Sequence, residues 1–184
     1  MRNAFRCVWW MFAIMVVTGC ASAPQYRYYT IDMQPGAKIE SVVQLVAVRI
    51  DVNQALQRPE ILIRTSPTQV EYYALDRWAS DLQEQVTEKL RTEFGTPAPD
   101  AKRLNLDGTL MSFEQIDAST GTEVQVKLEV VVDSLTFQKI YQRREPAAAA
   151  TAPAVVEALS RATEAIASEL AADLAQVVAN VGKN

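Results

Sequence analysis

The chain has 184 residues, of which 18 are lysine or arginine, 22 are aspartate or glutamate and none is histidine. This length suits one domain with a genuine core, and the mildly acidic balance lacks the basic footprint of a nucleic-acid-binding protein. Without histidine, the chain has no histidine-based acid–base catalysis, no Ser-His-Asp or Cys-His nucleophile, and few means of binding zinc.

The first twenty residues have the pattern of a lipoprotein signal peptide. Arg2 and Arg6 form a short positive start, and residues 8–17 form an apolar run of secretory length. The run is too short for a transmembrane helix, which needs roughly 20 apolar residues. The segment 16–22 resembles the lipobox of bacterial lipoproteins, in which Cys20 is acylated and everything before it is removed. A plain signal peptide with an accidental cysteine is the alternative.

We therefore expect a lipoprotein signal peptide at residues 1–19, a lipidated tether at 20–25 and a single periplasmic domain at 26–184. Cys20 is expected to carry a diacylglycerol and an N-linked acyl chain such as palmitate. Several acyl chains, at about 0.8 kcal/mol per buried methylene, hold a domain stably at a membrane. Ala21 in place of Asp after the cysteine indicates, by the usual sorting pattern of such lipoproteins, the periplasmic face of the outer membrane. No other cofactor and no metal is expected.

Alternating apolar and polar residues predict strands in the first half of the chain. The expected strands cover residues 26–32, 42–52, 60–65 and 69–74. The last two form a hairpin around Ser66-Pro67-Thr68, and residues 53–59 form a loop.

A helix is expected from Asp76, as its N-cap, to about Phe94. Four apolar residues recur at every fourth position and form one stripe, namely Trp78, Leu82, Val86 and Leu90. Gly95 and Pro97 mark the end of this helix, and residues 96–102 are expected to form a loop.

The second half predicts three strands and a long helix. The strands cover residues 104–116, 124–132 and 135–143, and Gly108 indicates either a bulge or a close approach of the backbone. A connector rich in alanine, residues 146–153, precedes a helix over about 155–181. The apolar stripe of this helix comprises Val155, Leu159, Ala162, Ile166, Leu170, Leu174, Val177 and Val181. The stripe either packs across the sheet or contributes in part to a partner or a homo-oligomer.

The order of strands, helix, strands and helix, with tight hairpins, predicts the fold class. It indicates an α+β domain in which a largely antiparallel sheet carries two main helices on one face.

Arginine and aromatic side chains gather around the predicted hairpin and the start of the predicted helix. The candidate partner-binding residues are Arg58, Pro59, Arg64, Tyr72, Tyr73 and Arg77. Such residues are the usual anchors of protein interfaces. An internal role is the alternative, because Arg77 can pair with Glu60 or Glu71. No catalytic residues are assigned, since the nearest carboxylate pair is interpreted as helix capping.

The same segments resemble a known family. Residues 58–64 (Arg-Pro-Glu-Ile-Leu-Ile-Arg), Tyr72-Tyr73 and Arg77-Trp78-Ala79 are similar to the ABC-type transport auxiliary lipoproteins, the PqiC-like family. The lipobox, residues 28–31 and the C-terminal helix extend the resemblance over nearly the whole mature chain. The chain departs from the family pattern at two places. It has Gln57 where Asp is frequent, and it has Ser80-Asp81 after Arg77-Trp78-Ala79, where an acidic residue or proline often follows directly.

The resemblance implies a non-catalytic subunit of a lipid-transport system that maintains the cell envelope. Its partners would be a periplasmic MCE-domain protein and inner-membrane transporter subunits, and its fold would resemble the N-terminal domain of TolB. Two alternatives remain open at this point. One is a lipoprotein that itself binds a lipid or another envelope ligand in an apolar pocket, and the other is an assembly factor for the outer membrane. An enzyme is the least favoured class.

Overall fold

Strands occupy most of the domain, and two helices pack against them. The computed structural model describes residues 23–32, 34, 41–94, 97–118, 121–132, 135 and 137–181. Its elements in chain order are β1 (Arg27–Tyr29), β2 (Ser41–Val52), the short 3-10 helix η1 (Gln54–Gln57), β3 (Glu60–Ser66), β4 (Gln69–Trp78), α2 (Leu82–Glu93), β5 (Pro97–Ala118), β6 (Gly121–Val132), β7 (Phe137–Pro146) and α3 (Ala152–Val181). The predicted signal peptide and Cys20 lie outside the described residues.

The strands form one sheet in the order β1-β4-β3-β5-β6-β7, and β2 pairs with β5 beside that path. β5 is long enough to take two neighbours in succession on one edge. Its first part pairs in parallel with β2, up to Val52 opposite Leu110, and its last part pairs in parallel with β3, around Ile63 opposite Gln115. The β3–β4, β5–β6 and β6–β7 pairs are antiparallel, and β1–β4 is parallel. The predicted α+β class is confirmed, with a mixed sheet.

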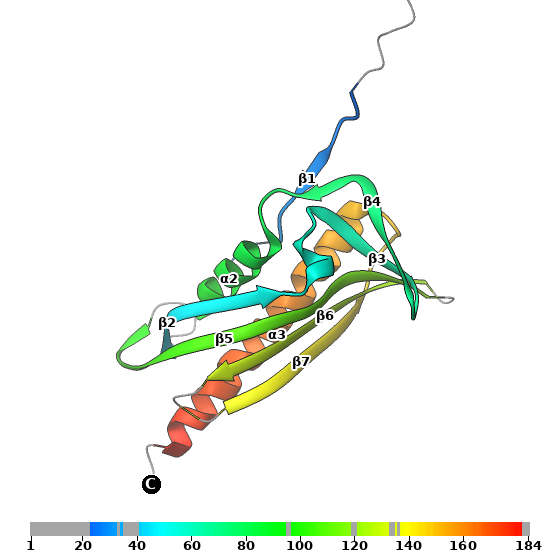
Figure 1. The fold of residues 1–184 in the computed structure, drawn as a ribbon. Helices are drawn as coiled ribbons and strands as arrows, with labels where there is room; N and C mark the ends of the chain where they lie inside the picture. Colours follow the sequence, from blue (N-terminus) through cyan, green and yellow to red (C-terminus); the bar gives the residue numbers. More distant parts are fainter. Residues whose placement is uncertain are drawn as a thin grey trace, which may run out of the picture.

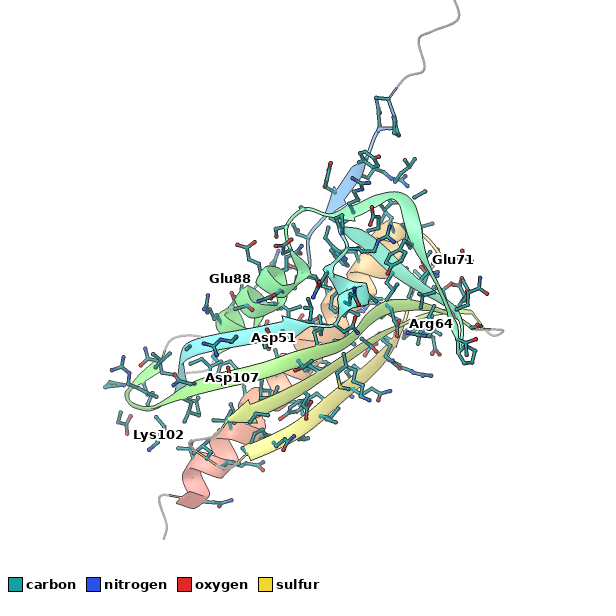
Figure 2. All side chains as sticks on the ribbon, in the orientation of Figure 1. Asp51, Arg64, Glu71, Glu88, Lys102 and Asp107 are labelled. Atoms are coloured by element: carbon teal, nitrogen blue, oxygen red, sulfur yellow. The ribbon has the colours of Figure 1, made fainter. Side chains whose placement is uncertain are left out.

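Both helices cover the same face of the sheet. α3 lies along β6 and β7, and α2 lies beside β2 and touches α3 (Figure 1). Alternate residues of β6 point into this layer, and all five from Val124 to Val132 are buried. The other face of the sheet carries polar side chains, with Asp51, Arg64 and Asp107 toward the viewer in Figure 2.

The predicted start of the first helix is wrong. Asp76 and Trp78 belong to β4, and α2 begins at Leu82 after Asp81. Trp78 N donates to the Pro59 carbonyl at 2.7 Å, so its backbone is already used in a strand-like contact. Asp76 is 3% exposed and accepts two hydrogen bonds from Arg27, at 2.6 and 2.8 Å. Trp78 continued the apolar period only because the strand and the helix face the same core.

Two predicted loops also differ from the structure. Residues 97–102 begin β5, because β2 lies alongside and pairs with them. The loop at 53–59 contains η1, which the Asn53 side chain caps by accepting a hydrogen bond from Leu56 N at 3.2 Å. Neither feature has a local apolar period, so the pattern alone favoured loops.

The long C-terminal helix packs on the sheet, as the first of its two interpretations predicted. The stripe positions from Val155 to Leu174 are buried, and Val177 is half-buried. The connector before it is shorter than expected, since β7 reaches Pro146 and α3 starts at Ala152. Over the described part of the chain, no helix has the length and apolarity to cross a membrane.

Candidate functional site

The structure brings Arg58 and Arg77 together around one carboxylate. Arg58 follows η1, and Arg77 lies near the end of β4, directly opposite Glu60 at the start of β3. Arg58 Nε lies 3.2 Å from Glu60 Oε2, and Arg77 Nη2 lies 3.2 Å from Glu60 Oε1. Glu60 therefore holds both guanidinium groups, and the expected alternative partner of Arg77, Glu71, instead accepts a hydrogen bond from Gln69.

Each of these guanidinium groups also stacks on a tyrosine. The Arg58 guanidinium carbon lies 4.1 Å from the centroid of the Tyr72 ring, and that of Arg77 lies 3.7 Å from the Tyr26 ring centroid. Such contacts contribute roughly 0.5–1 kcal/mol at exposed sites. The result is a continuous series, Tyr72–Arg58–Glu60–Arg77–Tyr26, which we call the arginine–tyrosine ladder.

The ladder is fixed at its Tyr72 end, and Arg58 beside that end is its most exposed guanidinium. The Tyr72 hydroxyl donates to the Ala55 carbonyl at 3.2 Å, which fixes the ring under Arg58. The Arg58 side chain is 57% exposed, whereas that of Arg77 is 27% exposed. Buried Arg77 Nε has no hydrogen-bond partner within the described residues. Because a guanidinium is a planar donor of fixed geometry, Arg58 is presented to a partner already oriented.

A cavity of about 380 Å³ adjoins Arg58 and Pro59. Its floor includes Trp78, which is 5% exposed and packs edge-to-face on Phe113 with ring centroids 5.5 Å apart. The remaining lining residues are Val52, Leu56, Gln57, Ala79, Ser80, Asp81, Leu82 and Gln83. Trp78, a member of the predicted apolar stripe, is thus a core residue that also lines this cavity.

A second, shallower groove of about 620 Å³ continues from this cavity between β2 and α2. The two share Asp81 and Gln83. The groove walls are strongly polar, with Arg49 on β2 and Glu84, Thr87, Glu88 and Arg91 on α2. Figure 2 shows Glu88 projecting outward from α2.

The other two candidate residues are tied to β5 and do not belong to the ladder. Arg64 Nη2 lies 2.9 Å from Glu114 Oε2, and the Glu114 side chain is only 2% exposed. The Tyr73 hydroxyl donates to Gln115 Oε1 at 2.5 Å, and burial raises the pKa of Tyr73 to about 12. Both side chains brace the β3–β4 hairpin against the sheet.

Tyr26 is the ladder residue that the sequence did not single out. It precedes β1, whose residues pair with Asp76, Arg77 and Trp78 about fifty positions later. A parallel pairing at that separation leaves no local signal, because neither strand has a turn that leads to the other.

A further polar cluster joins β7 to α3 at the opposite side of the helix layer. Lys139 Nζ lies 2.7 Å from Asp173 Oδ2 and 3.0 Å from Glu169 Oε1, and the Tyr141 hydroxyl donates to Asp173 at 2.7 Å. Burial favours a higher pKa for Asp173, but the hydrogen bonds from Lys139 and Tyr141 outweigh it and lower that pKa. The described residues contain no group of three or more acidic or cysteine side chains placed to hold a metal ion.

Comparison with known proteins agrees with the fold. A family model for the ABC-type transport auxiliary lipoprotein component matches residues 29–171. The structure is similar to the crystal structure of a Xanthomonas campestris protein of the DUF330 family, with a TM-score of 0.68 and 15% identity over 86% of this chain and 100% of that one. A second solved structure, of an uncharacterized protein, gives a TM-score of 0.64 and 14% identity over 82% of this chain and 99% of that one. No curated protein matches the sequence.

Proposed function

Because the chain belongs to the family of ABC-type transport auxiliary lipoprotein components, we propose that it is the non-catalytic subunit that ties a lipid-transport system to the outer membrane. Acylated Cys20 anchors it at the periplasmic face. The folded domain then docks a periplasmic MCE-domain protein, which connects to the inner-membrane transporter subunits.

The arginine–tyrosine ladder is the observation that supports docking. It combines an exposed, pre-oriented guanidinium at Arg58 with the fixed ring of Tyr72, and it adjoins a cavity that can accept a side chain of a partner. Interface hot spots are enriched in arginine and tyrosine and lie beside such pockets. Glu60 neutralises part of the charge of the two arginines. The ladder therefore favours a partner that offers oxygen acceptors, either carbonyl or carboxylate, together with apolar contact.

The test of docking is Arg58→Gln in the acylated protein. We expect a loss of about 2 kcal/mol in binding to the MCE-domain protein, roughly thirtyfold in Kd, as for a hot-spot arginine. The melting temperature should fall by no more than a few degrees, because an exposed ion pair contributes about 0–1 kcal/mol to stability. Arg161→Gln is the matched control, since Arg161 is 48% exposed and pairs with one carboxylate, Glu157, at 3.0 Å. Equal binding by the two variants places the interface elsewhere.

The test of anchoring is Cys20→Ala. Without the thiol, the chain should remain unprocessed or appear outside the outer-membrane fraction. A Cys20→Ala protein that is processed normally and still fractionates with the outer membrane contradicts the anchor.

A second candidate function is direct binding of a small envelope ligand. The cavity beside Trp78 favours it, since about 380 Å³ lies within the range of ligand pockets. Detergent extraction separates the candidates. Co-purification of an MCE-domain protein supports docking, whereas a lipid bound without a protein partner supports ligand binding. Recovery of an outer-membrane β-barrel instead indicates an assembly factor.

A further inference from the structure

Three large apolar side chains are exposed together where the chain enters the domain. Tyr26, Tyr28 and Leu75 expose 38%, 62% and 39% of their surface. Tyr28 lies opposite Arg77 in the parallel β1–β4 pair, and Leu75 shares that face because it is two residues from Arg77. The Arg77 guanidinium lies over the Tyr26 ring and so joins the two strands. We call Tyr26, Tyr28 and Leu75 the β1 surface.

The β1 surface is the part of the domain nearest to Cys20 in the chain. Only six positions separate Cys20 from Tyr26, and six extended residues span at most about 20–22 Å. β1 lies at one end of the molecule, and the C-terminal end of α3 lies at the opposite end (Figure 1). If Cys20 is acylated, as the proposed function requires, the tether holds the β1 end against the membrane.

The charge at this end differs from that of the whole domain. Three arginines, Arg27, Arg58 and Arg77, form ion pairs here with two carboxylates, Asp76 and Glu60. This set carries a net charge of +1, whereas the chain from Cys20 onward has 16 basic and 22 acidic residues. An anionic membrane surface therefore repels these paired groups less than it repels the acidic domain as a whole.

We propose that the β1 surface lies in the interfacial layer of the membrane that holds Cys20 and fixes the orientation of the domain on it. Tyrosine suits this layer, since the ring is apolar and the hydroxyl remains hydrated. The acyl chains supply the affinity, and the β1 surface supplies a second point of contact that stops the domain from rotating about its tether. The arginine–tyrosine ladder, which ends at Tyr26, is thereby held just beneath the membrane.

The experiment uses the processed, acylated protein in phosphatidylethanolamine–phosphatidylglycerol vesicles whose acyl chains carry bromine, a contact quencher of indole fluorescence. Tyr28→Trp places an indole in the β1 surface. Ile140→Trp is the matched control, because Ile140 is 50% exposed on β7 and lies outside the β1 surface. Trp78 is the only tryptophan of the mature chain, is buried, and gives the same background in both proteins.

We expect bromolipid to cause a clear loss of fluorescence in Tyr28→Trp and no loss beyond the wild-type background in Ile140→Trp. Circular dichroism checks that both variants fold. Equal quenching at the two positions overturns the proposal, because the domain then has no preferred orientation.

Two further outcomes separate this proposal from the proposed function. Vesicle flotation reports the anchor: a processed protein that does not float overturns both the anchor and the orientation that rests on it. A protein that floats without quenching at position 28 retains the anchor and loses only the β1 surface. A third outcome combines two results: the indole of Tyr28→Trp is not quenched, and Tyr28→Ser abolishes binding of the MCE-domain protein. The surface then belongs to a protein partner, and the membrane contact is refuted.

Discussion

Buried charged side chains of this domain are held by partners on other elements or one helical turn away. Glu114 on β5 pairs with Arg64 on β3, and Asp76 on β4 pairs with Arg27 on β1. Lys89 on α2, 1% exposed, pairs with Glu93 and donates to the Gln34 carbonyl at 2.7 Å. Burying a charge is tolerated only with such partners, since an uncompensated charge costs several kcal/mol.

Arg64→Ala should therefore destabilise the domain rather than weaken its docking. Removing one partner of a fully buried pair costs about 3–5 kcal/mol. We expect about 2–3 kcal/mol here, because the Arg64 side chain is 32% exposed and water can partly solvate Glu114 in the variant. Urea unfolding measures the loss.

The control is Arg49→Ala, because Arg49 is 77% exposed and pairs loosely with Asp107 at 3.5 Å on the same polar face of the sheet. It should cost no more than about 1 kcal/mol. Adding Glu114→Gln to Arg64→Ala should restore part of the stability. A stable Arg64→Ala protein that fails to bind its partner shows instead that Arg64 is an interface residue.

Among the elements, β5 organises the sheet because it pairs with three strands, β2 and β3 on one edge and β6 on the other. Gly108 sits where β2, β5 and β6 meet, opposite Ile50 and Val130. A Cβ atom added there lies 2.8 Å from Ile50 Cδ1 and 2.9 Å from the Glu129 carbonyl oxygen. Of the two sequence interpretations, the close approach of the backbone is the one that the structure supports.

Gly108→Ala should consequently destabilise the sheet by about 1–3 kcal/mol, the cost of overpacking a core. The clash with the Glu129 carbonyl involves backbone, which cannot move without disturbing the β5–β6 pair. Thr109→Ala, one residue away on the exposed face, is the control and should cost less than about 1 kcal/mol. Equal chemical-denaturation midpoints for the two variants contradict the close approach.

The β7–α3 contact contains a buried tyrosine, Tyr141, and the β3–β4 hairpin contains a half-buried one, Tyr73. Burial raises the pKa of Tyr141, and its hydrogen bond to Asp173 raises it further. Burial likewise raises the pKa of Tyr73 to about 12. Because these folded-state pKa values exceed the ordinary value of about 10, the stabilising contribution is fully present below pH 10. It is lost as the pH rises above that value.

We expect the free energy of unfolding to fall as the pH rises from about 10 to about 12, because the unfolded chain gains tyrosinate that the folded chain resists. Tyr73→Phe should reduce the slope of this fall, and Tyr141→Phe should reduce it independently. Urea denaturation at several pH values measures the slope. If neither substitution changes the slope, other groups cause the loss of stability at alkaline pH.

At the scale of the whole molecule, stability comes from one apolar layer between the sheet and its two helices. The buried set includes residues of β2, β3, β5, β6, both helices and the end of β4. The only cysteines are Cys7 and Cys20, so the domain after Cys20 has no means of forming an internal disulfide. The uncovered face of the sheet is polar and contributes little apolar burial.

The mature domain should therefore have the same melting temperature with and without a chelator, and with and without a reductant. Circular dichroism melts of the acylated protein in detergent check both conditions. A decrease of more than about 4 °C, the effect of roughly 1 kcal/mol, with either reagent indicates a metal or a disulfide that the sequence did not lead us to expect.

Much of this architecture follows from the sequence alone, because its causes are local. The alternation in residues 124–132, the strand predicted at residues 60–65 and the long apolar stripe after Val155 correspond closely to β6, β3 and α3. A strand period of two and a helix period of 3.6 are properties of neighbouring residues, so one sequence reveals them. The family resemblance, which rested on residues 58–64, Tyr72-Tyr73 and residues 77–79, is confirmed by the family model over residues 29–171. Each of these motifs is a short continuous stretch of the chain, so one sequence reveals it.

Only the tertiary structure decided what depends on distant partners. Trp78 continues the period of α2, yet the Pro59 carbonyl holds it in β4. Residues 97–102 have no strand pattern, yet β2 makes them a strand by pairing with them. The ladder forms because the parallel β1–β4 pair brings Tyr26 to Arg77. The fold also places Arg64 and Tyr73 away from the ladder, where they contact β5. Such pairings depend on how the whole chain folds, because the gain from each contact appears only after the intervening loop has closed.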